Sequence, residues 1–136
     1  MIKPIMKSEF FLRLPSEDAG PDDAATGQDL LDTLNEHEHE CVGLAANMIG
    51  VRKRIICVKD GNRTLLMYNP QILEQVNAYQ TSEGCLSLIG ERPCTRYRRI
   101  KVEYLDENFV RRIKNFSGYT AEIIQHEIDH CNGIVI

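Results

Sequence analysis

The sequence lacks any long apolar run. Its uninterrupted apolar stretches are only a few residues long, well short of the roughly 20 residues that span a bilayer. Its first residues, MIKPIMKSEFFLRLPSEDAG, contain no apolar signal-peptide core. An excess of positive charge is also absent, because the formal net charge is −4 at pH 7. We therefore expect a soluble cytoplasmic protein that neither enters a membrane nor is dedicated to binding DNA.

Cysteine pairs with the C-x-x-C spacing of structural zinc sites are absent as well. The five cysteines, at positions 41, 57, 85, 94 and 131, are an odd number. In a chain without a secretion signal, such a set is not expected to form a disulfide framework. These residues are therefore expected to be metal ligands or buried free thiols.

The composition is that of one ordinary globular domain, which we expect to span residues 1–136. The chain is 43% hydrophobic and 26% charged, and at this length folding buries roughly two-thirds of the unfolded surface. Its charge is uneven, since residues 14–51 contain nine acids and no Lys or Arg, whereas residues 92–114 are mainly basic. Two solvated faces explain this pattern most simply. A basic face toward RNA or an anionic peptide is the alternative.

Residue patterns predict mainly short strands after one early helix. Residues 15–28 are rich in Pro, Gly, Asp and Ser and predict a surface loop. Residues 28–40 place leucines on one side and acids on the other, which predicts an amphipathic helix. Strands are expected at 54–59, 65–68 and 72–81, with a hairpin turn at 60–62. A second hairpin is expected from strands 100–105 and 109–116.

A last helix is predicted over residues 118–131, with Ser117 as its N-cap and Gly133 at its end. Isoleucines at 123, 124 and 128 spread over a broad arc of this helix, which indicates that it is largely buried. Antiparallel strands around one central helix make the predicted fold class α+β.

This last helix contains the motif H-E-x-x-H at residues 126–130. His126 and His130 are four residues apart, so both imidazoles lie on one helix face and can reach a single ion, with Glu127 beside it. The alternative is a buried pair of histidines and a partnered glutamate without metal. That arrangement would need several hydrogen bonds to offset the lost hydration, so the motif predicts a divalent metal site.

The third protein ligand is expected upstream of the motif. A catalytic metal site commonly takes three protein ligands and leaves one position for water. Only six residues follow His130, too few to return to the ion. Cys131 points about 100° of helix rotation away from His130, and Cys41 and Cys57 are explained as small buried side chains.

Two cysteines then remain, and Cys85 is favoured while Cys94 stays open. Cys85 lies within SEGCLSL at residues 82–88. Gly84 allows the main chain to approach an ion closely. The next N–H group, on Leu86, would then face the reacting group.

Three segments together resemble the signature motifs of the peptide deformylase family. They are residues 41–50 (CVGLAANMIG), 83–87 (EGCLS) and 125–130 (QHEIDH), and their order and separations also fit. The resemblance covers nearly the whole chain. It implies a deformylase-like α+β fold and a hydrolase that removes the formyl group from N-formylmethionine on nascent bacterial or organellar chains. It also implies one divalent metal ion, Fe²⁺ by preference, with Zn²⁺, Ni²⁺ or Co²⁺ accepted.

The resemblance assigns catalytic roles to five residues. Cys85, His126 and His130 would hold the metal. Glu127 would take a proton from the bound water and later deliver it to the leaving amine. The metal and the Leu86 N–H would stabilise the oxyanion.

The resemblance also implies a set of substrate-binding residues: Val42, Gly43, Gly84, Ile123 and Arg92. The glycines would lie beside the substrate backbone, and the aliphatic side chains, with Leu86, would form the methionine pocket or else ordinary core. Arg92 would be the arginine that the family places after its second motif. Glu83 and Asp129 are candidates for hydrogen bonds to the metal ligands, although a surface salt bridge explains Asp129 equally well.

The first motif departs from the family pattern G-φ-G-φ-A-A-x-Q, where φ is an apolar residue. Cys41 replaces the first glycine and Met48 replaces the glutamine. The glutamine amide donates a hydrogen bond to the oxyanion, whereas a thioether cannot donate. Losing one such donor costs on the order of 10²–10³ in rate. We therefore expect an enzyme of weakened activity.

Two further functions are considered. One is a deformylase-like protein that binds metal and peptide without useful chemistry. The other is a general H-E-x-x-H endopeptidase, which the upstream cysteine ligand disfavours. The chain stops three residues beyond Gly133, so any transient ribosome contact is expected at most through the basic segment 92–114.

Overall fold

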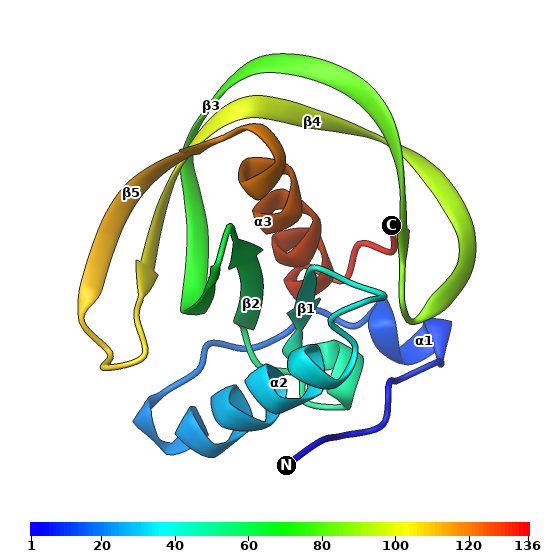
Figure 1. Ribbon diagram of the computed structural model, residues 1–136, viewed down its shortest axis with the longest axis vertical. Coiled ribbons are helices and arrows are strands. Elements are labelled where there is room, and N and C mark those ends of the chain that lie inside the picture. Colours follow the sequence, from blue (N-terminus) through cyan, green and yellow to red (C-terminus); the bar gives the residue numbers. More distant parts are fainter.

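The computed structural model describes residues 1–136. The chain forms one five-stranded antiparallel sheet that curves around a helix (Figure 1). The strands are β1 (Gly43–Ala45), β2 (Ile55–Asp60), β3 (Arg63–Cys85), β4 (Leu88–Leu105) and β5 (Arg111–Ser117). Their order in the sheet is their order in the chain, as expected for antiparallel strands joined by short turns. None of the helices has the length and hydrophobicity of a membrane-spanning segment.

The helical elements are α1 (Glu9–Leu12), the 3₁₀ helix η1 (Pro21–Asp23), α2 (Ala24–Glu36), the 3₁₀ helix η2 (Ala46–Ile49) and α3 (Gly118–Cys131). Figure 1 shows β3 and β4 arching over α3, while α2 lies across the opposite side of the short strands β1 and β2. Nine of the 14 residues of α3 are buried. The predicted α+β class and the central, buried last helix are therefore confirmed.

The last helix has the predicted bounds, but its start differs in one respect. Ser117 occupies the N-cap position, yet its side chain makes no capping hydrogen bond. At the other end, Gly133 adopts a φ of +76°, a left-handed conformation that glycine accepts without a steric penalty.

The early helix begins and ends four residues before the predicted 28–40. Pro21 opens η1, which leads directly into α2, because proline fits the first turn of a helix. Leu34 is the last buried residue of α2. The polar residues 37–40 that follow have no apolar side chain to bury and form a turn in which the Cys41 N–H still bonds to the His37 carbonyl.

The strands are longer than predicted. Runs 65–68 and 72–81 belong to one strand, β3, which continues through Asn69 and Pro70 with register shifts on either side of residues 71 and 72. β4 begins at Leu88, twelve residues before the predicted start. The turn predicted at 60–62 does join β2 to β3. β5 follows the second predicted turn.

A short segment that leads into α1 and includes its first residue, Glu9, connects two parts of the molecule that are distant in the chain. The Met6 N–H donates to the Met48 carbonyl at 2.7 Å, and the Lys7 ammonium donates to the Leu86 carbonyl at 2.8 Å. We call residues 6–9 the amino-terminal strap. It joins η2 to the turn between β3 and β4.

Candidate active site

Helix α3 brings both predicted histidines and the glutamate of the motif together inside the fold. The Nε2 atoms of His126 and His130 lie 3.1 Å apart. One possible ligand atom from each of His126, Glu127 and His130 lies within 4.8 Å of the others. All three residues are buried. The four-residue spacing thus has the geometric effect expected from the helical repeat.

The Glu83 carboxylate contacts one of these two histidines, and Arg96 in turn contacts Glu83. His126 Nδ1 lies 2.8 Å from Glu83 Oε1, so the ring donates through Nδ1 and its Nε2 atom faces that of His130. The guanidinium of Arg96 donates to Glu83 through Nε and Nη2 and to Asp129 through Nη1 at 2.6 Å. Such partners fix the tautomer and orientation of a ligating histidine.

Arg96 is the functional-site residue that sequence analysis missed. It is only 4% exposed, because it lies under the curve of β4 between two acids. Both acids hold the pKa of the guanidinium above its ordinary value, against the opposing effect of burial. Asp129 therefore pairs with a buried arginine, not with a surface base, and Glu83 contacts a histidine as anticipated.

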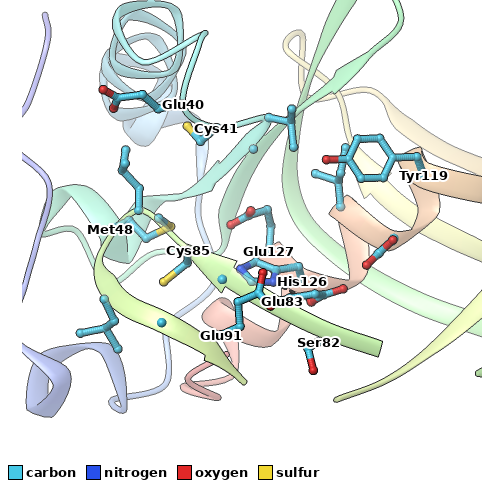
Figure 2. A pocket seen from close by; sticks show the side chains of 18 of the residues that line it. Glu40, Cys41, Met48, Ser82, Glu83, Cys85, Glu91, Tyr119, His126 and Glu127 are labelled. Carbon is cyan, nitrogen blue, oxygen red and sulfur yellow. Dashed lines mark hydrogen bonds and ion pairs between the residues drawn. The ribbon is translucent and has the colours of Figure 1, made fainter. Parts of the chain in front are cut away.

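Cys85 ends β3 and lines the same cavity as His126 and Glu127 (Figure 2). Burial alone would raise the pKa of its thiol, but a hydrogen bond with His126 and backbone N–H groups of Leu88 and Ser87 lower it overall. The tight group of ligand atoms contains His126, Glu127 and His130, without the Cys85 sulfur. Cys94, the alternative third ligand, does not line the cavity.

The donor set fits a divalent transition metal. A thiol of lowered pKa and two imidazoles are ligand types that suit iron, zinc, nickel and cobalt. Glu127 Oε1 is buried without a hydrogen-bond partner, an arrangement that native proteins tolerate mainly where a ligand or water satisfies the atom. In the metal-free protein, burial and the charge of His126 lower the pKa of His130 to about 3.

Glu127 has the properties of a general base. Burial raises its pKa to about 7, and a catalytic carboxyl group transfers protons best when its pKa lies near the working pH. For His126, burial would lower the pKa, but hydrogen bonds with Cys85 and Glu83 and the nearby carboxylates raise it to about 10 in the absence of metal. A bound cation would compete directly with that proton.

The cavity in front of these groups has a volume of about 630 Å³. Most of the predicted substrate and oxyanion residues line it, namely Val42, Gly43, Met48, Gly84, Leu86 and Ile123. Arg92 does not line it; the guanidinium lies 3.9 Å from Glu9 at the end of the strap. Cys41, expected to be a buried small side chain, is half-buried and lines the cavity.

Gly43 is required where it stands. A Cβ atom at this position would lie 2.7 Å from Ile123 Cγ2 and 3.0 Å from Glu127 Oε2. The residue belongs to β1, an edge strand that pairs only with β2. Its free edge therefore offers unpaired backbone groups to an extended peptide.

Met48 lies at the wall of the cavity and is 1% exposed. Its sulfur accepts a weak hydrogen bond from the Ala45 N–H at 3.5 Å. No donor group reaches the cavity from this side chain, since a thioether has none.

Comparison with known proteins agrees with these motifs. The polypeptide deformylase family model matches residues 7–136. A peptide deformylase of Clostridium beijerinckii is 52% identical over 136 residues, which is the full length of both chains. The chain belongs to the polypeptide deformylase family. The resemblance drawn from the three motifs is therefore confirmed, and the protein is a metallohydrolase.

Solved structures of the family share the fold. The actinonin-bound class I type b peptide deformylase from Acinetobacter baumannii has a TM-score of 0.88 at 30% identity, covering 99% of this chain and 95% of that one. The peptide deformylase from Thermus thermophilus has a TM-score of 0.86 at 32% identity, covering 99% of this chain and 83% of that one. Identity of 52% over a whole relative supports the removal of N-formyl groups and does not favour an inactive binding protein.

Proposed function

We propose that this protein removes the formyl group from the N-terminal formylmethionine of nascent polypeptides, using one divalent ion held by Cys85, His126 and His130. The observation that carries the proposal is the buried pair of imidazoles with Glu127 beside them at the cavity wall. When bound, such an ion supplies Lewis acidity and a water of lowered pKa. Fe²⁺ is the preferred ion by family resemblance, with Zn²⁺, Ni²⁺ or Co²⁺ as substitutes.

The protein's own groups then perform the remaining work. Glu127, with its pKa raised to about 7, accepts a proton from the attacking water and delivers it to the leaving amine. The backbone N–H of Leu86 donates to the formyl oxygen as negative charge develops there. Glu83 keeps the His126 ring oriented through Nδ1. Burial would raise the pKa of Glu83, but hydrogen bonds from His126 and Arg96 hold it well below its ordinary value, so Glu83 stays ionised.

Substrate placement follows from the cavity wall. Val42 and Ile123 present apolar surface beside Leu86, which suits a methionine side chain. We place an extended substrate backbone beside Gly43 and Gly84, which line the cavity. A side chain at Gly43 would instead contact Ile123 and Glu127 of α3. We assign Arg92 no substrate contact, since it pairs with Glu9.

The missing donor at Met48 limits this reaction. With Leu86 as the remaining protein donor, we expect turnover on the order of 10²–10³ below that of the same site with a second donor. The enzyme is therefore weak but competent, and the ion and Glu127 are sufficient for measurable hydrolysis.

The test is hydrolysis of formyl-Met-Ala-Ser by protein purified without oxygen and loaded with Fe²⁺, together with elemental analysis. We expect one metal ion per chain and turnover that a chelator removes. Turnover equal to that of Glu127→Ala would contradict the proposal. Cys85→Ser, expected to lose metal content without unfolding, tests the third ligand separately. A cytoplasmic location and a transient ribosome contact stay predictions, and sedimentation with ribosomes tests the latter.

A further inference from the structure

Cys85 and Leu86 lie at the far end of a long ribbon of two strands, β3 and β4 (Figure 1). Few side chains of this ribbon are buried: none within residues 71–85, and only Arg96 within residues 88–99. A two-stranded ribbon with so little burial is marginally stable by itself. Contacts from other parts of the molecule are therefore needed to hold the far end of the ribbon in one position.

The far end of the ribbon is also irregular. The register shifts between Gly84 and Cys85, so Ile89 and Gly90 of β4 have no partner on β3. Ile89 is fully exposed, and Gly90 adopts a φ of +87°. Such an irregularity interrupts the ladder of main-chain hydrogen bonds. The ladder therefore does not by itself fix the peptides on either side of Leu86.

The amino-terminal strap contacts this end of the ribbon at two points. The Lys7 ammonium donates to the Leu86 carbonyl at 2.8 Å, and the Glu9 carboxylate lies 3.9 Å from the Arg92 guanidinium on β4. The strap is itself fixed to the opposite side of the site, because the Met6 N–H donates to a carbonyl of η2 at 2.7 Å. It therefore connects the end of the ribbon to a part of the molecule that is buried.

Of the two contacts, that of Lys7 acts on the peptide nearest to the reacting groups. The carbonyl that it binds belongs to the peptide that joins Leu86 to Ser87. The N–H of the same peptide, on Ser87, hydrogen-bonds to the Cys85 thiol, and Ser87 is only 3% exposed. An ammonium on the carbonyl oxygen restrains this peptide and polarises its N–H toward the sulfur. One exposed lysine thus acts on the Cys85 sulfur and on the residue whose N–H faces the formyl oxygen.

We propose that Lys7 is a positioning residue of this active site, whose ammonium holds the Leu86–Ser87 peptide so that the Leu86 N–H faces the formyl oxygen and the Cys85 sulfur faces the metal. The inference rests on the proposed deformylase function and deepens it. Lys7 does not line the cavity, so it acts through the peptide that it binds and not on the substrate. Because the Met48 side chain has no donor, stabilisation of the oxyanion depends on the orientation of the Leu86 N–H.

The experiment compares three variants of the full chain, each loaded with Fe²⁺, in the hydrolysis of formyl-Met-Ala-Ser. Lys7→Met keeps the apolar stem and removes the ammonium, and it should lower kcat by about three- to tenfold with KM little changed, since the lost hydrogen bond is a partly solvated one. Lys7→Arg supplies a cationic donor again and should restore most of kcat. Lys3→Met is the matched control, because the Lys3 ammonium lies 3.9 Å from Asp29 on α2, away from the ribbon; it should leave kcat unchanged.

Two further readouts do not depend on turnover. Amide hydrogen exchange, followed by mass spectrometry on metal-loaded protein, should be at least about threefold faster over residues 84–91 in Lys7→Met and unchanged over α3. In protein loaded with Co²⁺, the thiolate-to-cobalt absorption band reports on the contact between Cys85 and the ion. This band should shift in Lys7→Met and return in Lys7→Arg. The melting temperature should stay close to that of the wild type, because Lys7 is exposed.

The outcomes are distinct. Wild-type kcat and wild-type exchange in Lys7→Met would overturn the positioning role and leave the deformylase function standing. A loss of kcat without faster exchange over residues 84–91 and without a change in the cobalt band would also refute it, as would an equal loss in Lys3→Met. No hydrolysis by metal-loaded wild-type protein would instead contradict the proposed function itself, and the exchange comparison would still decide whether Lys7 holds the end of the ribbon.

Discussion

Replacing Met48 with glutamine adds the one donor that the oxyanion site lacks. The two side chains have nearly the same length, and Met48, a residue of η2, is almost fully buried. The Ala45 N–H that now contacts the sulfur at 3.5 Å can donate to the new amide oxygen. The amide nitrogen is then free to point into the cavity and donate to the formyl oxygen.

The magnitude follows from these contacts. One additional oxyanion donor corresponds to about 10²–10³ in kcat, or about 2.7–4 kcal/mol of transition-state stabilisation. The amide is less well satisfied in the free enzyme than the thioether, because only one of its groups has a protein partner. We therefore expect the same substitution to lower the free energy of unfolding by about 1–3 kcal/mol.

The assay is kcat and kcat/KM for formyl-Met-Ala-Ser with Fe²⁺-loaded protein, alongside thermal unfolding. Met48→Leu is the matched control, since leucine fills a similar volume and has no donor. We expect Met48→Gln to exceed the wild type by at least tenfold and Met48→Leu to stay close to it. If both variants turn over at the same rate, the oxyanion argument is wrong.

Three further predictions concern the residues around the metal site. Burial raises the pKa of Glu127 from about 4.5 to about 7, so its charge destabilises the metal-free fold as pH rises through that interval and has no effect below pH 4. Glu127→Gln should therefore raise the free energy of unfolding at pH 8 by up to about 3 kcal/mol and leave it unchanged at pH 4. It should also abolish hydrolysis. Denaturant titrations that show no gain in stability at pH 8 would contradict this prediction. Arg96→Met removes the guanidinium that pairs with the Glu83 carboxylate and should lower the free energy of unfolding in urea by about 3–5 kcal/mol. The double variant Glu83→Gln/Arg96→Met should recover part of that stability. A melting temperature of Arg96→Met equal to that of the wild type would refute the role of the buried ion pair. Gly43→Ala places a methyl group 2.7 Å from the Ile123 Cγ2 methyl of α3. It should lower the free energy of unfolding by about 1–3 kcal/mol and lower kcat/KM. The control Gly20→Ala, whose added methyl meets no atom within 4 Å, should change neither quantity.

The catalytic helix could be predicted from local signals alone. Its apolar residues recur with the helical period, Gly133 ends it, and the motif places His126 and His130 on one face. The strand at Ile100–Leu105 could be predicted for a similar reason, because buried and half-buried residues alternate there. In both cases the spacing of apolar residues inside the segment indicates which of its faces is buried.

The long arms of β3 and β4 could not be predicted in the same way. None of residues 71–85 is buried, and between Leu88 and Arg99 only Arg96 is. These arms are strands because they pair with each other over a long distance, from Gln71 to Cys85 on one side. When neither face of a strand is buried, apolar and polar residues need not alternate along it, so the sequence gives no sign of the pairing.

Arg96 was hidden for a related reason. In the sequence it is one of several bases in a basic segment, and nothing local separates it from Arg98 or Arg99. Its burial depends on the curve of β4, which brings it between Glu83 and Asp129. The two acids belong to recognisable motifs, so the signal that could have found Arg96 was the need of two partly buried carboxylates for a shared cation.

The strap formed by residues 6–9 has a consequence for how this enzyme is tuned. It ties the peptide carbonyls of Met48 and Leu86 to one short stretch, although that stretch holds no reactive group. We therefore expect substitutions in this strap to change the distance between the two cavity walls that carry Met48 and Leu86 and, with it, the rate of turnover. Two chains with identical signature motifs would then differ in turnover because of residues that lie outside those motifs.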